Sequence, residues 1–504
     1  MARTLEPRKP RRSRKSEMEG APRLPIKLEP VSNGEILPAP PRREVERAAA
    51  LAMARAGEAA ARTGLSRRDF LSSACGAATT LVAMNQVLGC AATGAGGGYA
   101  LPGDASLDEE AAREALGGDE LILDVQTHHV DPGGSWAQDN PAFSDFIRST
   151  PQARCGERDP IECLSRDHYI KEIFLDSDTD LAVLSALPGA PRDNPLQTEE
   201  AAATREIVDR LGRGRRLQIH GIVLPNLDLV DQLERMQALV ETWGVSAFKL
   251  YPPWGPRGVG YWLDDPDVGI PVIERARQLG VRRLAIHKGL PLVGMDPLRA
   301  RCRDVGVVAR RYPDVTFMIY HSGYDPGVLE GPYAPGPAAA VAGIDSLIRS
   351  LEENGVPPGS NVYTDLGSTW RQLMTRPTEA AHALGKLLRY VGEDRILWGS
   401  DSIWYGSPQD QIMALRAFEI APRLQEQHGY LALTRERKAK IFGRNALHAY
   451  GLTLDDVRQK IRKDDLSRAK ETYLEAPTPT YRTYGPRTRR ELLDLVRRRG
   501  GLPG

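Results

Sequence analysis

Three histidines and one aspartate stand where short apolar segments of this sequence end. His128 follows LILDVQT, His287 ends RLAIH, His321 ends VTFMIYH and Asp401 ends RILWGSD. The chain has only nine histidines in 504 residues, so three at such positions favour a functional cluster over separate core residues. Imidazole and carboxylate groups suit zinc or a similar divalent ion. The four residues therefore predict a metal centre.

A catalytic metal centre keeps one position for water. The ion lowers the pKa of that water from about 15.7 to about 7, which makes hydroxide available at neutral pH. Gln126 lies two residues before His128, so both side chains share one face of a strand and can point inward. A Gln carbonyl oxygen can ligate a metal, but it is a weaker donor than imidazole. The sequence leaves open whether Gln126 is a ligand.

A (β/α)8 barrel is the architecture that would bring these segment ends together. From residue 119 onward, short β-branched segments alternate with helical patterns. Catalytic side chains in such a barrel come from the C-terminal ends of the strands. An open doubly wound sheet is the alternative, but no GxGxxG follows the first strand. The predicted strands cover residues 120–126, 180–186, 217–224, 245–251, 283–288, 315–321, 361–367 and 395–401.

The sequence resembles the amidohydrolase superfamily, and within it the amidohydrolase-related family that includes aminocarboxymuconate semialdehyde decarboxylase. The resemblance covers about residues 119–452 and rests on the motifs DVQTHH, FLDSDTDLAVLSALP, AFKLYPP, AIHKG, IYHSG, RILWGSDS and GRNALHAYGL. It implies a barrel that binds one divalent metal ion, with zinc as the expected ion. The implied ligands are His128, His287 and Asp401, and His321 is the implied catalytic partner. Gln126 departs from the family pattern, because the family has a His there.

Three functions follow as hypotheses. The first is a metal-dependent hydrolase that acts on a small carbonyl, lactone or amide substrate, with His321 or Asp401 moving the proton. The second is a non-oxidative decarboxylase of a small aromatic or unsaturated carboxylic acid. The third is a catalytically degenerate, exported barrel with a binding role, for which Gln126 is the best evidence.

Three residues are expected to bind the substrate. Lys249 lies in the fourth predicted strand, and Trp254 and Trp404 lie near strand ends. Some members of the superfamily carboxylate a fourth-strand Lys to bridge two metals. We prefer a cation that binds a substrate carboxylate, because a second metal would require more histidines. The tryptophans suggest a planar substrate, although barrel cores contain Trp as well.

An N-terminal arm and an export signal are expected before the barrel. Residues 1–65 are basic, rich in Pro and Ala and without aromatics, so they should be largely disordered, with a helix possible at 49–61. Residues 66–100 contain SRRDFL, a weakly apolar run and small residues, which is the order of a twin-arginine signal peptide and its linker. The signal predicts a periplasmic or extracellular protein. A later start at Met18 or Met53 stays open.

Charge and cysteine content limit the remaining expectations. The net charge is +1, but the first 68 residues hold sixteen Lys and Arg against eight Asp and Glu, so residues 69–504 carry −7. This balance gives no argument for a nucleic-acid partner, and the partner expected from the site is a small-molecule substrate. Cys155 and Cys163 could form a disulfide in an oxidising compartment, but the sequence leaves this open. The barrel should span 115–452. Residues 453–504 form a helical extension for packing or homo-oligomer contacts, and no transmembrane helix is expected.

Overall fold

The structure is a computed structural model. It describes residues 23–479, except 35, 37, 39, 90–95, 151–154, 213–214, 292–293, 336–340 and 463. The start of the basic arm and residues 480–504 of the expected C-terminal extension therefore lie outside the described residues.

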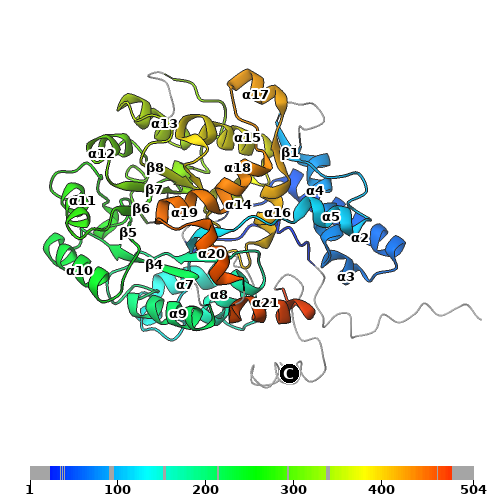
Figure 1. The fold of residues 1–504 in the computed structure, drawn as a ribbon, viewed down its shortest axis with the longest axis horizontal. Helices are drawn as coiled ribbons and strands as arrows, with labels where there is room; N and C mark the ends of the chain where they lie inside the picture. Colours follow the sequence, from blue (N-terminus) through cyan, green and yellow to red (C-terminus); the bar gives the residue numbers. More distant parts are fainter. Residues whose placement is uncertain are drawn as a thin grey trace, which may run out of the picture.

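Eight parallel strands form a barrel at the centre of the molecule (Figure 1). Each strand pairs with the next one along the chain. The first and last strands also meet, because Val125 N donates to Trp398 O (2.9 Å) and Asp401 N donates to Gln126 O (2.8 Å). The predicted fold class is confirmed, and each predicted strand is present. The strands are β2 (Leu123–Thr127), β3 (Leu181–Leu184), β4 (Leu217–Val223), β5 (Ala247–Leu250), β6 (Arg283–His287), β7 (Thr316–Tyr320), β8 (Val362–Asp365) and β9 (Ile396–Leu397).

Amphipathic helices cover the outside of the barrel (Figure 1). In α13 the buried residues Ile344, Leu347, Ile348 and Leu351 recur at helical spacing and form one apolar face. The helices between consecutive strands are α6 (Trp136–Asp139), α7 (Pro141–Ser149), α8 (Arg166–Ile170), α9 (Thr198–Leu211), α10 (Leu229–Glu241), α11 (Gly269–Gln278), α12 (Val305–Arg311), α13 (Ile344–Glu353), α14 (Thr369–Leu373) and α15 (Pro377–Lys386).

Alternate residues of the strands belong to two hydrophobic clusters. Leu284 and Ile286 of β6 belong to the larger cluster, which also includes helix residues such as Leu347. Ala285, between them, belongs to a smaller cluster that also contains Leu447 of α19 (Asn445–Tyr450). This two-residue period is the one that a strand imposes on its side chains. It is also why the strands were recognisable in the sequence.

The N-terminal region is folded where the sequence predicted a largely disordered arm. Residues 43–63 form helix α2 (Arg43–Thr63), which packs against α4 (Ala74–Leu88). The buried face of α2 consists of Val45 and small alanines, including Ala48, Ala52 and Ala56. Small side chains let two helices approach closely, so little apolar bulk is needed. Residues 49–61, where the sequence allowed a helix, lie within α2, so the expectation of disorder is contradicted only by the other described residues of 1–65.

Within residues 66–100, the expected export signal, the described residues 66–89 and 96–100 include α3 (Arg67–Leu71), α4 and β1 (Gly97–Tyr99). Strand β1 pairs antiparallel with β10 (Phe418–Ile420), and α5 (Glu109–Leu116) leads into the barrel. These N-terminal helices stand together on one side of the barrel, in blue in Figure 1. None of the described helices is long and apolar enough to cross a membrane.

The chain after β9 packs on the barrel. A buried ion pair joins Arg216 to Asp464, with Nε and Oδ2 2.6 Å apart. It ties the described part of the C-terminal extension to the start of β4.

A disulfide joins Cys155 to Cys163, the pairing that the sequence left open. The remaining helices are α16 (Gln409–Ala417), α17 (Pro422–His428), α18 (Arg435–Ala439), α20 (Leu454–Ile461) and α21 (Asp465–Glu475).

Candidate active site

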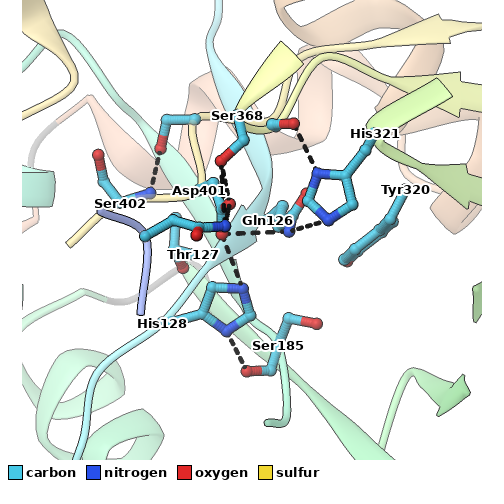
Figure 2. Close-up of polar contacts among 12 residues, drawn as sticks. Gln126, Thr127, His128, Ser185, Tyr320, His321, Ser368, Asp401 and Ser402 are labelled. Carbon is cyan, nitrogen blue, oxygen red and sulfur yellow. Dashed lines mark hydrogen bonds and ion pairs between the residues drawn. The ribbon is translucent and has the colours of Figure 1, made fainter. Parts of the chain in front are cut away.

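Asp401 lies at the centre of a buried polar cluster at the C-terminal ends of the strands (Figure 2). Its Oδ1 atom lies 3.2 Å from Nε2 of His128 and 3.2 Å from Nε2 of Gln126. Its Oδ2 atom accepts hydrogen bonds from the Ser368 hydroxyl and from Nδ2 of Asn33, the latter at 3.1 Å. Each carboxylate oxygen thus has its own set of partners.

Backbone carbonyls fix the orientation of two imidazoles in this cluster. Nδ1 of His128 lies 2.8 Å from Ser185 O, and Nδ1 of His321 lies 2.7 Å from Gly367 O. A carbonyl oxygen only accepts, so Nδ1 carries the hydrogen in both rings and Nε2 is left to face the site. Metal-ligating histidines are commonly oriented in this way.

Gln126 connects the two sides of the cluster. Its Nε2 atom lies between Oδ1 of Asp401 and Nε2 of His321, which is 3.4 Å away. Both neighbours accept hydrogen bonds, which is consistent with the amide nitrogen pointing toward them. Gln126 and His128 approach the same oxygen of Asp401. The expectation that they share one side of the strand end therefore agrees with their placement.

His287 lies beside the cluster rather than on Asp401. Its ring contacts the edge of His321, with centroids 4.6 Å apart, and stacks on Tyr251 at 5.1 Å. Its Nε2 atom lies 3.3 Å from Leu290 O. Of the sequence-predicted residues, His128, Gln126, His321 and Asp401 meet directly, and His287 reaches them through His321.

The donor atoms of this cluster can be tested for their fit to a divalent ion. Within the described part of the chain, no three His, Cys, Asp or Glu side chains are arranged as a metal site. Two buried atoms of the cluster that could ligate a metal nevertheless lack a hydrogen-bond partner among the described residues. They are Oε1 of Gln126 and Nδ1 of His287. Nε2 of His128 and Oδ1 of Asp401 attract each other only if a proton or a cation is shared between them. The chemistry of the donor set therefore fits a metal ion.

Burial sets the protonation states of the site. It lowers the pKa of His321 to about 4, although the nearby charge of Asp401 acts in the opposite direction. Burial also opposes ionisation of Asp401, but the hydrogen bond and charge of His128 hold the pKa of that carboxyl below its ordinary value. At neutral pH the site therefore holds a neutral imidazole that can accept a proton and an ionised carboxylate.

Lys249 occupies an aromatic environment next to the histidines. Its Nζ atom lies 3.4 Å from the centroid of the Tyr320 ring and 4.7 Å from that of Tyr251. These rings contact His321 and His287 respectively. Burial raises the pKa of the neighbouring Asp365 to about 8, and the charge of Lys249 only partly offsets this. The Lys249 cation is thus placed close to the cluster.

A cavity of about 340 Å³ adjoins the cluster and is lined in part by both tryptophans that were predicted to bind the substrate. The Trp404 ring lies 6.3 Å from the ring of His128, so the cavity and the cluster share this wall. An apolar, aromatic lining suits a planar ligand. Lys249 does not line the cavity. The lining consists of Gly34, Asn140, Ala142, Phe143, Phe146, Leu187, Pro188, Gly189, Ala190, Asp193, Trp254, Gly294, Met295 and Trp404.

Unusual backbone conformations occur at the same place. His321, Ser322, Ser368 and Asp401 all have positive φ angles, between 53° and 63°. Non-glycine residues rarely adopt this region, and residues that do so often cluster at functional sites. The backbone is therefore shaped to direct the side chains of His321, Ser368 and Asp401 into the cluster.

The sequence did not identify Ser368 and Asn33 as site residues. Ser368 follows the predicted eighth strand in DLGS, so its position at a strand end was an available signal. Asn33 comes from the arm that was expected to be disordered, and nothing in its local sequence indicates a contact with Asp401. Its role depends on a contact between distant parts of the chain.

A (β/α)8 barrel with buried His, Asp and Gln side chains converging at its strand ends defines a barrel enzyme. The model of the amidohydrolase family matches residues 124–452, and the chain belongs to this family. It is an enzyme of the amidohydrolase family. No curated protein matches the sequence significantly.

Several solved structures share the barrel. One is 5-carboxyvanillate decarboxylase from Novosphingobium aromaticivorans, with 13% identity, a TM-score of 0.42 and coverage of 68% of this chain and 99% of that one. Another is 2,6-dihydroxybenzoate decarboxylase from Rhizobium, with 14% identity, a TM-score of 0.37 and coverage of 66% and 99%. A third is 4-oxalomesaconate hydratase from Rhodopseudomonas palustris, with 16% identity, a TM-score of 0.37 and coverage of 71% and 100%. Similarity at this level does not identify a substrate.

Proposed function

We propose that this enzyme is a metal-dependent hydrolase that acts on a small carbonyl, lactone or amide substrate. One observation carries the proposal: Nε2 of His128 and the amide of Gln126 both face Oδ1 of Asp401, and a backbone carbonyl holds the His128 ring in place. His128, His287, Asp401 and Gln126 would hold one divalent ion, with zinc as the expected ion. When bound, the ion would supply an activated water.

The residues of the chain would divide the remaining work. The neutral His321 imidazole is suited to accept a proton at Nε2 and return it to the leaving group, because its Nδ1 is already committed to Gly367 O. Ser368 and Asn33 hold Asp401 in one orientation. Lys249, Trp254 and Trp404 would bind the substrate, the tryptophans through the adjoining cavity.

A second candidate is a non-oxidative decarboxylase of a small aromatic or unsaturated acid. The buried Lys249 cation favours a substrate carboxylate, and the aromatic cavity favours a planar ring. In this reaction His321 or Asp401 would first take up a proton from water or from the substrate and would then deliver it to the carbon that loses carbon dioxide. The two candidates use the same cluster and differ in their products.

Metal analysis combined with a substrate screen tests the proposed function. We expect the purified full-length protein to hold about one divalent ion per chain, to lose activity on treatment with a chelator, and to regain it when Zn²⁺ is added. The screen would contain lactones, amides and aromatic acids. A hydrolysed product supports the hydrolase, and released carbon dioxide supports the decarboxylase. A protein with neither bound metal nor turnover would contradict both.

We further propose that the twin-arginine route exports the protein to the periplasm or the extracellular space. The order of features in residues 66–100 supports this proposal, and so does the disulfide between Cys155 and Cys163. Replacing both Arg67 and Arg68 with Lys should retain the protein in the cytoplasm, because the paired arginines are the recognised feature of the signal.

Cell fractionation and immunoblotting would measure this retention. Arg62→Lys is the matched control, because Arg62 is exposed like Arg67, lies close by and is outside the motif. It should be exported normally. Equal amounts of the double variant and the wild type outside the cytoplasm would show that residues 66–100 are not a twin-arginine signal.

A further inference from the structure

We propose that Asn33 is a positioning residue for Asp401, and that residues 24–34, which we call the N-terminal strap, form part of the active site. The inference rests on the proposed function, because it gives Asp401 a role in binding the metal and in catalysis. It adds a segment that lies outside the matched family region of residues 124–452.

The strap is fastened to the loop that follows Asp401. Nζ of Lys27 donates to Tyr405 O and to Ser407 O, both at 2.7 Å, and its backbone N–H donates to Oδ2 of Asp410 at 3.0 Å. The strap also buries Ile26 and Leu28 in the core. Polar and apolar contacts therefore fix the strap relative to Asp401.

Local hydrogen bonds orient Asn33 at the end of the strap. The Ser32 hydroxyl donates to Ile36 O (2.8 Å) and accepts from Gly34 N (3.0 Å). Oδ1 of Asn33 accepts from Ile36 N at 3.2 Å, which directs the amide nitrogen toward Asp401. Ser32 and Asn33 are fully buried. In Figure 2 the strap is the blue ribbon next to Asp401.

The contact with Asp401 has a chemical consequence. Asn33 and Ser368 both donate to Oδ2, so they fix the plane of the carboxylate and leave Oδ1 facing His128 and Gln126. Groups that hold a metal-ligating carboxylate or imidazole in place typically change metal affinity or activity about 10–100-fold when they are removed. Asn33 has the geometry of such a group.

Gly34 lets the strap pass between the cluster and the adjoining cavity. A Cβ atom at this position would lie 2.9–3.2 Å from three ring atoms of Trp404, and the φ angle is +79°. Both features favour glycine. Gly34 and Trp404 line the cavity together, so the strap forms one of the walls that a substrate would meet. An active chain should therefore retain residues 24–34, which requires that residues 66–100 are not cleaved off after export.

The test uses the full-length protein and two replacements of Asn33. Asn33→Ala removes the donor, and Asn33→Leu removes it while keeping a similar volume. We expect Zn²⁺ affinity, measured by competition with a chelator, to fall about 10–100-fold in both. With a substrate in hand, kcat should fall and KM should change little. Glu29→Ala is the matched control, because this side chain is exposed on the same strap, and it should behave as wild type.

A second variant tests the strap without relying on metal binding. Lys27→Met removes the contacts of Nζ with Tyr405 O and Ser407 O and its ion pair with Asp410. Diethylpyrocarbonate modifies accessible histidines, and peptide mass spectrometry reports each one. We expect His128 and His321 to be protected in the wild type and modified in Lys27→Met. The exposed His448 should react equally in both proteins and serves as the internal control.

Each outcome has a defined meaning. Unchanged Zn²⁺ affinity in both Asn33 variants would overturn the positioning role. Equal modification of His128 in the wild type and in Lys27→Met would overturn the place of the strap in the site. If the wild type binds no Zn²⁺, the proposed function fails, and the modification experiment alone decides for or against the strap. If the Asn33 variants do not fold, the modification experiment with Lys27→Met again decides for or against the strap.

Discussion

Asp401→Asn is expected to abolish turnover and release the metal ion while the barrel stays folded. The change keeps the size of the side chain but removes the charge that faces His128. Loss of a general acid or base typically costs about 10²–10⁴ in rate, and loss of a carboxylate ligand adds to this. Asn tolerates the positive φ of 59° at this position, so backbone strain should not increase. Metal content, kcat and circular dichroism measure the three expectations.

Companion variants separate the roles of the cluster. His321→Asn should retain the ion and lose turnover, because His321 reaches Asp401 through Gln126; its φ of 63° also suits Asn. His287→Ala should lose both ion and activity if His287 is a ligand. Asp394→Asn makes the same change at an exposed residue before β9. It should leave metal content and kcat as in the wild type. If His321→Asn loses the ion while Asp401→Asn retains it, the assignment of ligand and proton carrier is reversed.

The barrel could be predicted because its sequence signals are local. Each strand is a short β-branched segment whose alternate residues enter different apolar clusters, as Leu284 and Ala285 do. The N-terminal region lacks such a signal. Helix α2 is buried through small alanines such as Ala48 and Ala52, and an alanine-rich sequence resembles that of a solvated segment. The sequence allowed a helix at 49–61 but did not indicate its packing, because close packing of small residues does not require high hydrophobicity.

The candidate site could be predicted only in part. Parallel strands bring their C-terminal ends to one face, so the placement of His128, His321 and Asp401 followed from the fold. The sequence could not place His287 beside His321 rather than on Asp401, because that depends on ring packing. It could not reveal Asn33 either, because this residue reaches Asp401 across 368 positions of the sequence. Contacts of this kind are decided by tertiary packing.

Gln126→His is expected to raise the affinity of the site for Zn²⁺. Gln126 already faces Oδ1 of Asp401 at 3.2 Å, so the new imidazole would enter the cluster beside His128. Imidazole nitrogen is a better donor than a carboxamide oxygen for zinc-like ions. Removal of groups that merely orient ligands changes metal affinity about 10–100-fold, so a gain in direct ligation should be at least about that large.

Two glycines bear on whether the larger ring fits. A Cβ atom at Gly367 would lie 2.0 Å from Oε1 of Gln126, and one at Gly399 would lie 3.1 Å from its Cβ. The carboxamide of Gln126 already fills the space beside these glycines, so an imidazole must take the place of the carboxamide and leave both glycines unchanged. Turnover is a separate matter. A displacement of about 1 Å in the reacting groups can cost about 10²-fold, so tighter metal binding need not bring faster catalysis.

Competition against a chelator would measure the dissociation constants of the wild type and of Gln126→His. Gln126→Leu is the matched control, because it keeps the bulk and provides no donor atom, and it should bind Zn²⁺ no better than the wild type. If affinity for Zn²⁺ fell in the order His, Gln, Leu at position 126, Oε1 of Gln126 would be a ligand in the natural protein. If Gln and Leu were equal and His tighter, residue 126 would face the ion without binding it. Equal constants in all three proteins would mean that residue 126 does not face the metal, and the metal centre would then have to be built without the end of β2.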